Sequence, residues 1–215
     1  MSFAASMTLL KGATLTLLLS LAAIALGLPL GLAMALIRWA RVPLISPILS
    51  AYVSIVRATP LVMLVLLIFF ALPTIGIDMD PVSAAIFSLM LNTAAFNCEI
   101  WRGGLIDFPK AQLEAARAFG MWPPHVFCHI VFPQLWKTCL PSLVNEMSLL
   151  IKASPAVAVI GLVDITRAAA RIGAATYEPL PPFLAATFFY VAILLPLILL
   201  QRIVERHSIE REELQ

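Results

Sequence analysis

Long stretches without a charged residue constrain this chain more than any other feature of its sequence. Four such runs cover residues 12–37, 58–77, 81–98 and 179–201. Each is close to the roughly 20 residues that a helix needs to cross the hydrocarbon core of a bilayer. Within lipid, a helix satisfies all its backbone hydrogen bonds inside one segment. We therefore predict an all-α integral membrane protein.

Composition excludes several classes of function. Apolar residues make up 61% of the chain and charged residues 12%, against roughly 45–50% and about 25% in globular proteins. About five crossings use roughly half the chain, so no other segment can bury a core of its own. We expect one transmembrane domain over residues 1–215, with no catalytic residues and no enzymatic activity. The net charge of only +2 argues against a nucleic-acid partner.

The pattern predicts five transmembrane helices. We place them at residues 12–37, about 60–72, 82–101, 143–163 and 183–201. Lysine and arginine gather in the turn after the first crossing, in the loop of about 102–141 and in the C-terminal tail, while the opposite side receives only Lys11, Arg167 and Arg171. Cation-rich loops face the cytoplasm. The N-terminus is therefore expected outside and the C-terminus in the cytoplasm.

The long loop contains a patterned run that predicts a helix-turn-helix elbow. Glu114, Ala115 and Ala116 would lie on a short helix, with Glu114 near its N-terminus, where the helix dipole favours a carboxylate. The small alanines would let another surface approach the backbone. Gly120 would turn the chain after this helix. Two prolines at 123–124 would then open the next helix.

This run resembles the EAA motif of the membrane subunits of ABC importers. That motif reads Glu-Ala-Ala, three residues, glycine, nine residues, isoleucine, one residue, Leu-Pro, and here it ends at Pro133 with Phe132 in place of the leucine. Similarity to the polar amino-acid branch extends to residues 57–61 and 92–104. The chain departs from that branch at 152–156, where Lys-Ala-Ser-Pro-Ala replaces the usual Lys-Asp-Thr-Ser-Leu.

The resemblance implies a type I importer permease that forms half of a pore for a polar amino acid or a related solute. Its partners would be a second permease subunit, identical or paralogous, two cytoplasmic ABC ATPases, and a periplasmic or tethered solute-binding protein. ATP and Mg would be bound by the ATPases, so this chain would bind no cofactor. Its location would be the inner membrane of a bacterium. The residues expected to couple it to the ATPase are Glu114, Ala115, Ala116, Gly120 and Pro133.

Polar groups inside the predicted spans are candidates for the transport path. Glu146 and Lys152 are candidate gating groups, because intramembrane charges are costly and usually face a partner or a cavity. Their spacing of six residues puts them about 240° apart on a helix, so they cannot simply neutralise each other. Pairing with other helices, snorkelling to the interface and contact with substrate are the alternative interpretations.

Three uncharged polar residues are candidates for the substrate path. They are Asn92, Asn97 and Ser154, the last beside a proline that can interrupt its helix. Each could instead form only a hydrogen bond between helices. No metal site is expected, because His125 and His129 share a helical spacing but lack a third ligand.

A small secondary transporter or channel is the alternative function. Such a protein is expected to show inverted repeats and acidic residues on broken membrane helices. The two halves of this chain show no such symmetry. An intramembrane enzyme would need a nucleophile with its base, or a set of metal ligands, at membrane depth, and neither is visible.

Overall fold

The computed structural model describes residues 3–212, and every regular element in that range is helical. Gln215, the end of the predicted cytoplasmic tail, lies outside the described residues. The α-helices are α1 (Phe3–Trp39), α2 (Ile45–Ala58), α3 (Leu61–Ala71), α4 (Pro81–Ile106), α5 (Lys110–Ala118), α6 (Pro123–Val126), α7 (Phe132–Ala153), α8 (Ile165–Thr176) and α9 (Leu180–Glu212). Short 3₁₀ helices follow α3 and α7, at Leu72–Ile75 and Ser154–Ile160, and a π-helical turn, Phe127–Val131, precedes α7.

Four segments are long and apolar enough to span a membrane. They are Phe3–Trp39, Pro81–Ile106, Pro123–Ile160 and Leu180–Ile203. A fifth span exists only if α2 and the α3 segment count as one, because these two are bent by 114°. The bend follows from Pro60, which pushes Thr59 into the extended conformation that residues before proline prefer.

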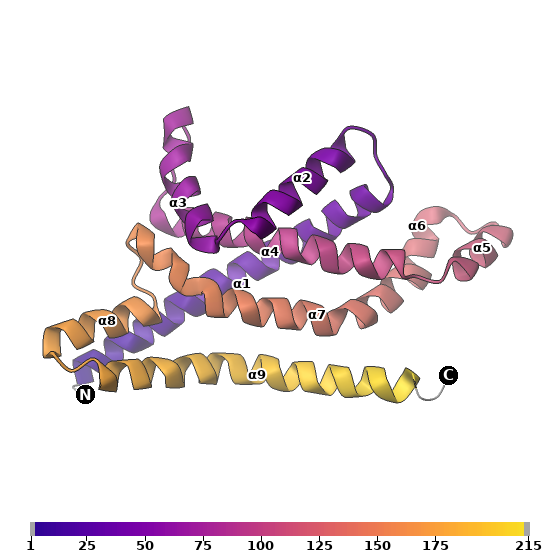
Figure 1. Cartoon of the computed structure of the whole chain (residues 1–215). Helices are drawn as coiled ribbons and strands as arrows, with labels where there is room; N and C mark the ends of the chain where they lie inside the picture. The colour runs from indigo at the N-terminus through magenta and orange to yellow at the C-terminus, as the bar shows by residue number, and fades with distance from the viewer. Residues whose placement is uncertain (1–2, 213–215) are drawn as a thin grey trace.

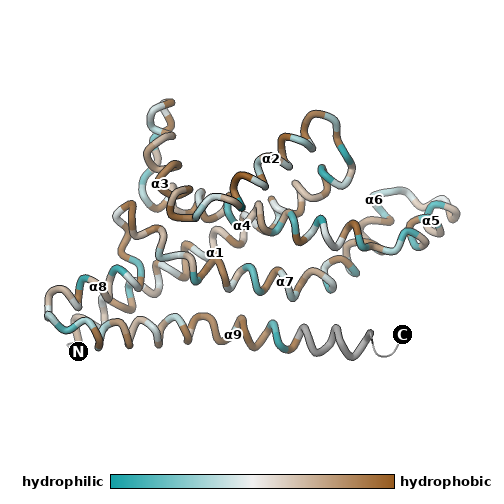
Figure 2. The backbone as a smooth tube through the Cα atoms, in the orientation of Figure 1, coloured by the Kyte–Doolittle hydropathy of each residue, from teal (hydrophilic) through white to brown (hydrophobic). Residues whose placement is uncertain are grey.

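The molecule is elongated, and different helices lie at its two ends (Figure 1). The start of α1, helix α8 and the start of α9 lie at one end, and α5 and α6 lie at the other. Helices α2 and α3 rise from one side of the bundle. Apolar residues cover most of α9 (Figure 2), and many of its large side chains are exposed, as expected for a surface that faces lipid.

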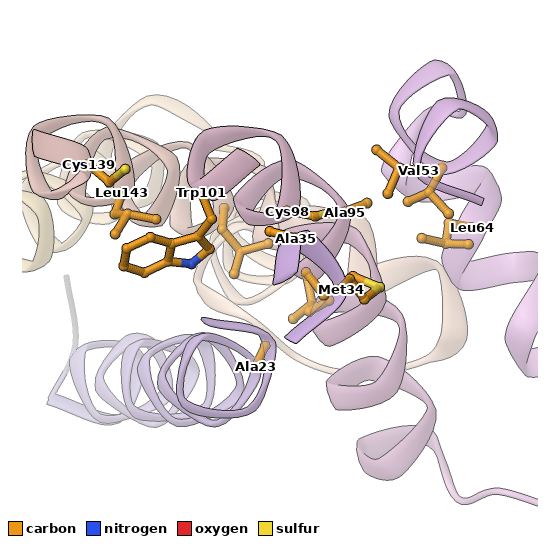
Figure 3. Packing of buried hydrophobic residues seen from close by; sticks show 14 of the residues in the cluster. Ala23, Met34, Ala35, Val53, Leu64, Ala95, Cys98, Trp101, Cys139 and Leu143 are labelled. Carbon is orange, nitrogen blue, oxygen red and sulfur yellow. The ribbon is translucent and has the colours of Figure 1, made fainter. Parts of the chain in front are cut away.

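Helices α1 and α4 form the centre of the core, and two glycines explain how closely they approach. A Cβ on Gly27 would lie 2.3 Å from Cγ2 of Thr93, and one on Gly31 would lie 2.8 Å from Cβ of Asn97. This i, i+4 pair of glycines provides the close helix contact that their spacing suggests. Figure 3 shows Trp101 of α4 near Ala35 of α1 and Leu143 of α7.

The end of the third span differs from the sequence-based prediction. We expected the helix to stop at residues 102–104, where an arginine and two glycines interrupt the apolar pattern. Instead α4 continues to Ile106. Gly104 allows α7 to pack closely, since a Cβ there would lie 2.5 Å from Sγ of Cys139. Its role is close packing rather than termination.

The fourth span also differs from the prediction. Helix α7 begins at Phe132 and runs through Pro141, so the segment between α4 and α7 covers residues 107–131 instead of 102–141. Pro133 lies just after the π-helical turn Phe127–Val131, which joins α6 to α7 without a break. At the other end, Pro155 lies just beyond the α-helix, which gives way to a 3₁₀ helix at Ser154.

Helix α8 was not predicted. Asp164 is fully buried and caps it, accepting from the backbone N–H groups of Thr166 and Arg167 at 3.1 and 3.0 Å. Its buried residues form one face that packs against the start of α1 and against α9, at the spacing Ile165, Ala168, Ala169 and Gly173. That helical periodicity was the available sequence signal.

Candidate coupling elbow and polar cavities

The EAA run forms an elbow at the end of the molecule where α5 and α6 lie (Figure 1). Glu114 occupies the middle of α5 instead of the predicted position near its N-terminus, because the helix starts earlier, at Lys110. Nε2 of Gln134 in α7 donates to Oε1 of Gln112 at 2.9 Å, which joins α5 to the start of the fourth span. This bond links α5 to α7 directly.

Gly120 makes the sharp turn that the sequence predicts. Its φ of +71° lies in the left-handed region. Met121 N donates to Ala116 O at 3.1 Å, and Gly120 N donates to Arg117 O at 2.9 Å. These two bonds form a Schellman motif, which ends α5 and satisfies its last carbonyls. The prolines at 123–124 then open α6 as predicted.

The two alanines of the motif face different environments. Ala116 is buried in the core at 4% exposure, whereas Ala115 is exposed. Phe119, one turn after Ala115, is 86% exposed, and Trp122 is 72% exposed. Sequence reasoning missed these two aromatic residues, although they flank the predicted turn. The exposed elbow surface is therefore Ala115, Phe119 and Trp122, a large apolar surface typical of a protein contact.

A small cavity with a mostly apolar lining lies where α4 and α7 meet the start of α3. Asn92 and Glu146 both line a cavity of about 210 Å³, together with Thr59 and Phe96 among others. Glu146 also lines an adjoining hollow of about 450 Å³ with Ser142 and Asn145. Its side chain is only 6% exposed. The structure thus brings a predicted substrate-path residue and a predicted gating residue together.

The other candidate residues for the transport path, Asn97, Ser154 and Lys152, do not line this cavity. Nδ2 of Asn97 donates to Oγ1 of Thr93 at 3.3 Å, and Asn97 packs against Gly31 of α1. Ser154 is fully buried at the break after α7, and its hydroxyl has no partner among the described residues. Lys152 is exposed and forms no recorded ion pair with Glu146.

A charged cluster beside the elbow was missed by sequence reasoning. Glu99 of α4 accepts from Nε and Nη2 of Arg102 at 3.0 and 2.6 Å, and it also pairs with Arg38 of α1. Nε of Arg38 donates to Oγ of Ser50 in α2 at 3.1 Å. The cluster therefore joins three helices. No group of three His, Cys, Asp or Glu side chains suited to a metal occurs in the part of the chain that the structure describes.

The apolar spanning helices and the exposed EAA elbow fit the membrane subunit of a transport system. The family model described as "Binding-protein-dependent transport system inner membrane component" matches residues 27–209, and the chain belongs to this family. It is a multi-pass membrane protein, the permease subunit of an ABC importer.

Individual relatives cover nearly the whole chain. The arginine transport system permease protein ArtQ of Bacillus subtilis is 36% identical over 92% of this chain and 91% of its own length. The glutamine transport system permease protein GlnP of Escherichia coli is 32% identical, with 92% and 91% covered. The crystal structure of an amino acid ABC transporter with histidines matches with a TM-score of 0.83, at 32% identity, over 93% of this chain and 94% of that chain. The MetNI methionine transporter, at 20% identity and a TM-score of 0.80, shows the shared fold.

Proposed function

We propose that this chain forms half of the path by which a bacterial importer carries a polar amino acid across the inner membrane. It crosses the membrane five times, with α2 and α3 acting together as the second crossing. The N-terminus lies outside and the C-terminus in the cytoplasm. This orientation is supported by the cations near the elbow, at the ends of α1 and α4 and on α5.

The names of the relatives support the substrate class. They name arginine, glutamine, and the group histidine, lysine, arginine and ornithine as transported solutes. The Asn92 and Glu146 cavity offers an amide and a carboxyl group among apolar side chains, and these two groups can bind the polar groups of an amino acid. We assign solute contact to these two residues. Lys152, exposed at the end of α7, is assigned to gating, and the fully buried Asn97 and Ser154 are assigned to the packing of the helices that surround the path.

The elbow is the docking site for an ATPase partner. ATP and Mg bind to that partner, two copies of which serve two permease subunits, and a solute-binding protein delivers the substrate. Closure of the ATPases would move α5, and the bond between Gln112 and Gln134 would pass this movement to α7. Glu114, Ala115, Ala116, Gly120 and Pro133 shape or flank the docking surface. The permease itself hydrolyses nothing.

One observation carries this proposal: the elbow exposes Ala115, Phe119 and Trp122 in a chain whose full-length relatives are amino-acid permeases. The test is uptake of labelled arginine, glutamine and histidine by vesicles that contain the complete importer. Uptake should require ATP inside the vesicles and the binding protein outside. Uptake driven by an ion gradient without ATP would instead establish a secondary transporter.

An elbow variant tests the docking site. Ala115→Trp should leave assembly in the membrane intact but lower ATP-driven uptake at least tenfold, because a large side chain would separate the docked surfaces. Ala33→Trp is the matched control, since Ala33 is an exposed alanine of α1. Normal uptake by the Ala115 variant would remove the elbow from the coupling mechanism.

A further inference from the structure

A strongly basic cavity lies beside the elbow. It has a volume of about 580 Å³ and is formed by the end of α1, the end of α4 and one face of α5. Five cations line it, together with one carboxylate, that of Glu114. The five are Arg38, Arg41, Arg102, Lys110 and Arg117.

The positive charge of this cavity is only partly compensated. Glu99 forms ion pairs with Arg38 and Arg102. Within residues 3–203, no ion pair is recorded for Arg41, Lys110 or Arg117. Three guanidinium or ammonium groups therefore face one hollow with a single lining carboxylate, so a bound anion would be stabilised there.

The cations are held by regular structure instead of by a loose loop. Lys110, Leu113, Glu114 and Arg117 follow the i, i+3, i+4, i+7 spacing, which places them on one face of α5. Arg41 lies in the turn after α1 with a φ of +53°. This left-handed conformation is unusual for a residue other than glycine. The cavity wall thus combines a helix face with a fixed turn.

The surroundings of the cavity contain apolar surface as well as charge. Trp39 and Ile106, which also line it, are 39% and 55% exposed. Trp39 is the last residue of α1 and Ile106 is the last residue of α4, two helices that are long and apolar enough to span the membrane. Leu44 and Ile45, in the following turn and at the start of α2, are exposed too. An acyl chain could follow this surface while its headgroup occupies the hollow.

We propose that this cavity binds the phosphate headgroup of an anionic phospholipid. Arginine binds phosphate oxygens through two parallel hydrogen bonds. Basic pockets between spanning helices suit anionic headgroups. The position at a helix end, next to exposed apolar side chains, favours a lipid over a soluble phosphate. A lipid in this position would connect α5 to α1 and α4, so it would also stabilise the elbow against the spans.

The test measures lipid binding to the purified, complete importer in a neutral detergent. Short-chain phosphatidylglycerol, phosphatidylcholine with the same chains, and glycerol phosphate are titrated separately, and binding is followed by native mass spectrometry and calorimetry. Phosphatidylglycerol should bind saturably and more tightly than the other two. Each of Arg41→Gln and Arg117→Gln should weaken its binding about fivefold, and the double variant about 30-fold.

Two control variants distinguish a loss of the cavity site from a general loss of positive charge and from misfolding. Arg171→Gln removes an exposed arginine from α8, at the other end of the molecule, and should leave binding unchanged. The double variant Arg41→Lys with Arg117→Lys keeps both charges but loses the paired hydrogen bonds, so it should bind less tightly than the wild type and more tightly than the double glutamine variant. Equal losses for Arg171→Gln and the cavity variants would overturn the proposal, as would the absence of saturable phosphatidylglycerol binding. Equally tight binding of glycerol phosphate would assign the cavity to a soluble phosphate ester and overturn its assignment to lipid.

Discussion

Glu99 connects α4 to α1 through ion pairs near the elbow. Its carboxylate binds Arg102 one turn along α4 and Arg38 at the end of α1, and Arg38 in turn binds Ser50 of α2. Each member is partly buried. Charge-assisted bonds of this kind are stronger than bonds between neutral groups, and breaking one leaves a desolvated charge without its partner.

We expect Glu99→Gln to lower the free energy of unfolding by about 2 kcal/mol, because two arginines lose their counter-ion. Apparent thermal unfolding of the complex in detergent measures this change. Glu178→Gln, which alters an exposed carboxylate between α8 and α9, should have an effect within about 0.5 kcal/mol. Similar losses for both variants would show that the Glu99 network contributes little.

Asp80 is a capping residue whose contribution depends on pH. Its carboxylate accepts from the hydroxyl of Ser83 at 2.5 Å and from the backbone N–H groups of Ser83 and Val82 at 3.2 and 3.0 Å. The Ser83 hydroxyl, followed by these N–H groups, holds the pKa of Asp80 below its usual value. A lowered pKa means that the charged cap stabilises α4 above about pH 4 and loses this effect as the pH falls through the folded-state pKa.

The stability difference between the wild type and Asp80→Ala should therefore shrink as the pH falls below about 4. Asp80→Asn is the matched variant, because asparagine caps a helix without titrating. The difference in stability between Asp80→Asn and Asp80→Ala should therefore stay constant with pH. Thermal unfolding of both variants and the wild type between pH 3 and 7 measures the two differences. If the difference in stability between the wild type and Asp80→Ala stayed constant from pH 3 to 7, Asp80 would not act as a charged cap.

At the scale of elements, small residues set the distances between helices. Gly27 and Gly31 bring α1 against α4, and Gly104 brings α4 against α7. In lipid, helix association depends on close packing and on hydrogen bonds between helices, because apolar burial against another helix gains little over burial in lipid. The small residues are consequently as important here as large apolar side chains are in a soluble core.

Gly31→Leu should separate α1 from α4 and destabilise the protein by about 3 kcal/mol or more, since a Cβ at this position would already lie 3.0 Å from the carbonyl oxygen of Ala94. Ala33→Leu adds a large side chain to an exposed position of the same helix and should be neutral. The two variants are compared by their yield of folded protein and by their apparent thermal unfolding temperature. Equal behaviour would mean that α1 does not pack against α4 through Gly31.

At the scale of the whole molecule, the two ends differ in charge and in shape. The cations of the basic cavity and the elbow share one end, while α8 and the start of α1 form the other (Figure 1). This polarity agrees with the proposed orientation, in which the elbow faces the cytoplasm. It also places the docking surface and the proposed lipid site side by side.

A cysteine introduced at position 80 should react with a membrane-impermeant reagent added outside right-side-out vesicles, and one at position 110 should react only after the vesicles are opened. The three native cysteines, Cys98, Cys128 and Cys139, are free in the structure and are replaced first. Labelling of position 110 from outside would overturn the five-crossing arrangement. Mass spectrometry of the labelled peptides gives the measurement.

The sequence by itself determined the class of fold, because charge-free runs of bilayer length leave a chain few alternatives to spanning helices. Local chemistry also determined the elbow turn: Gly120 provides the left-handed backbone there, and two prolines open the next helix. The family followed from the spacing of the EAA motif, which can be read along the sequence without knowledge of the rest of the fold.

Only the tertiary structure decided which polar residues meet. Asn92 and Glu146 line one cavity, whereas Asn97 faces α1, and a single sequence carries no information on the rotation of one helix against another. The helix ends were misplaced for a related reason. Charge and glycine at 102–104 suggest a stop in isolation, but packing of Gly104 against α7 supports the helix through Ile106. Close contacts between distant segments override local preference, since their free energy is absent from any short window of sequence.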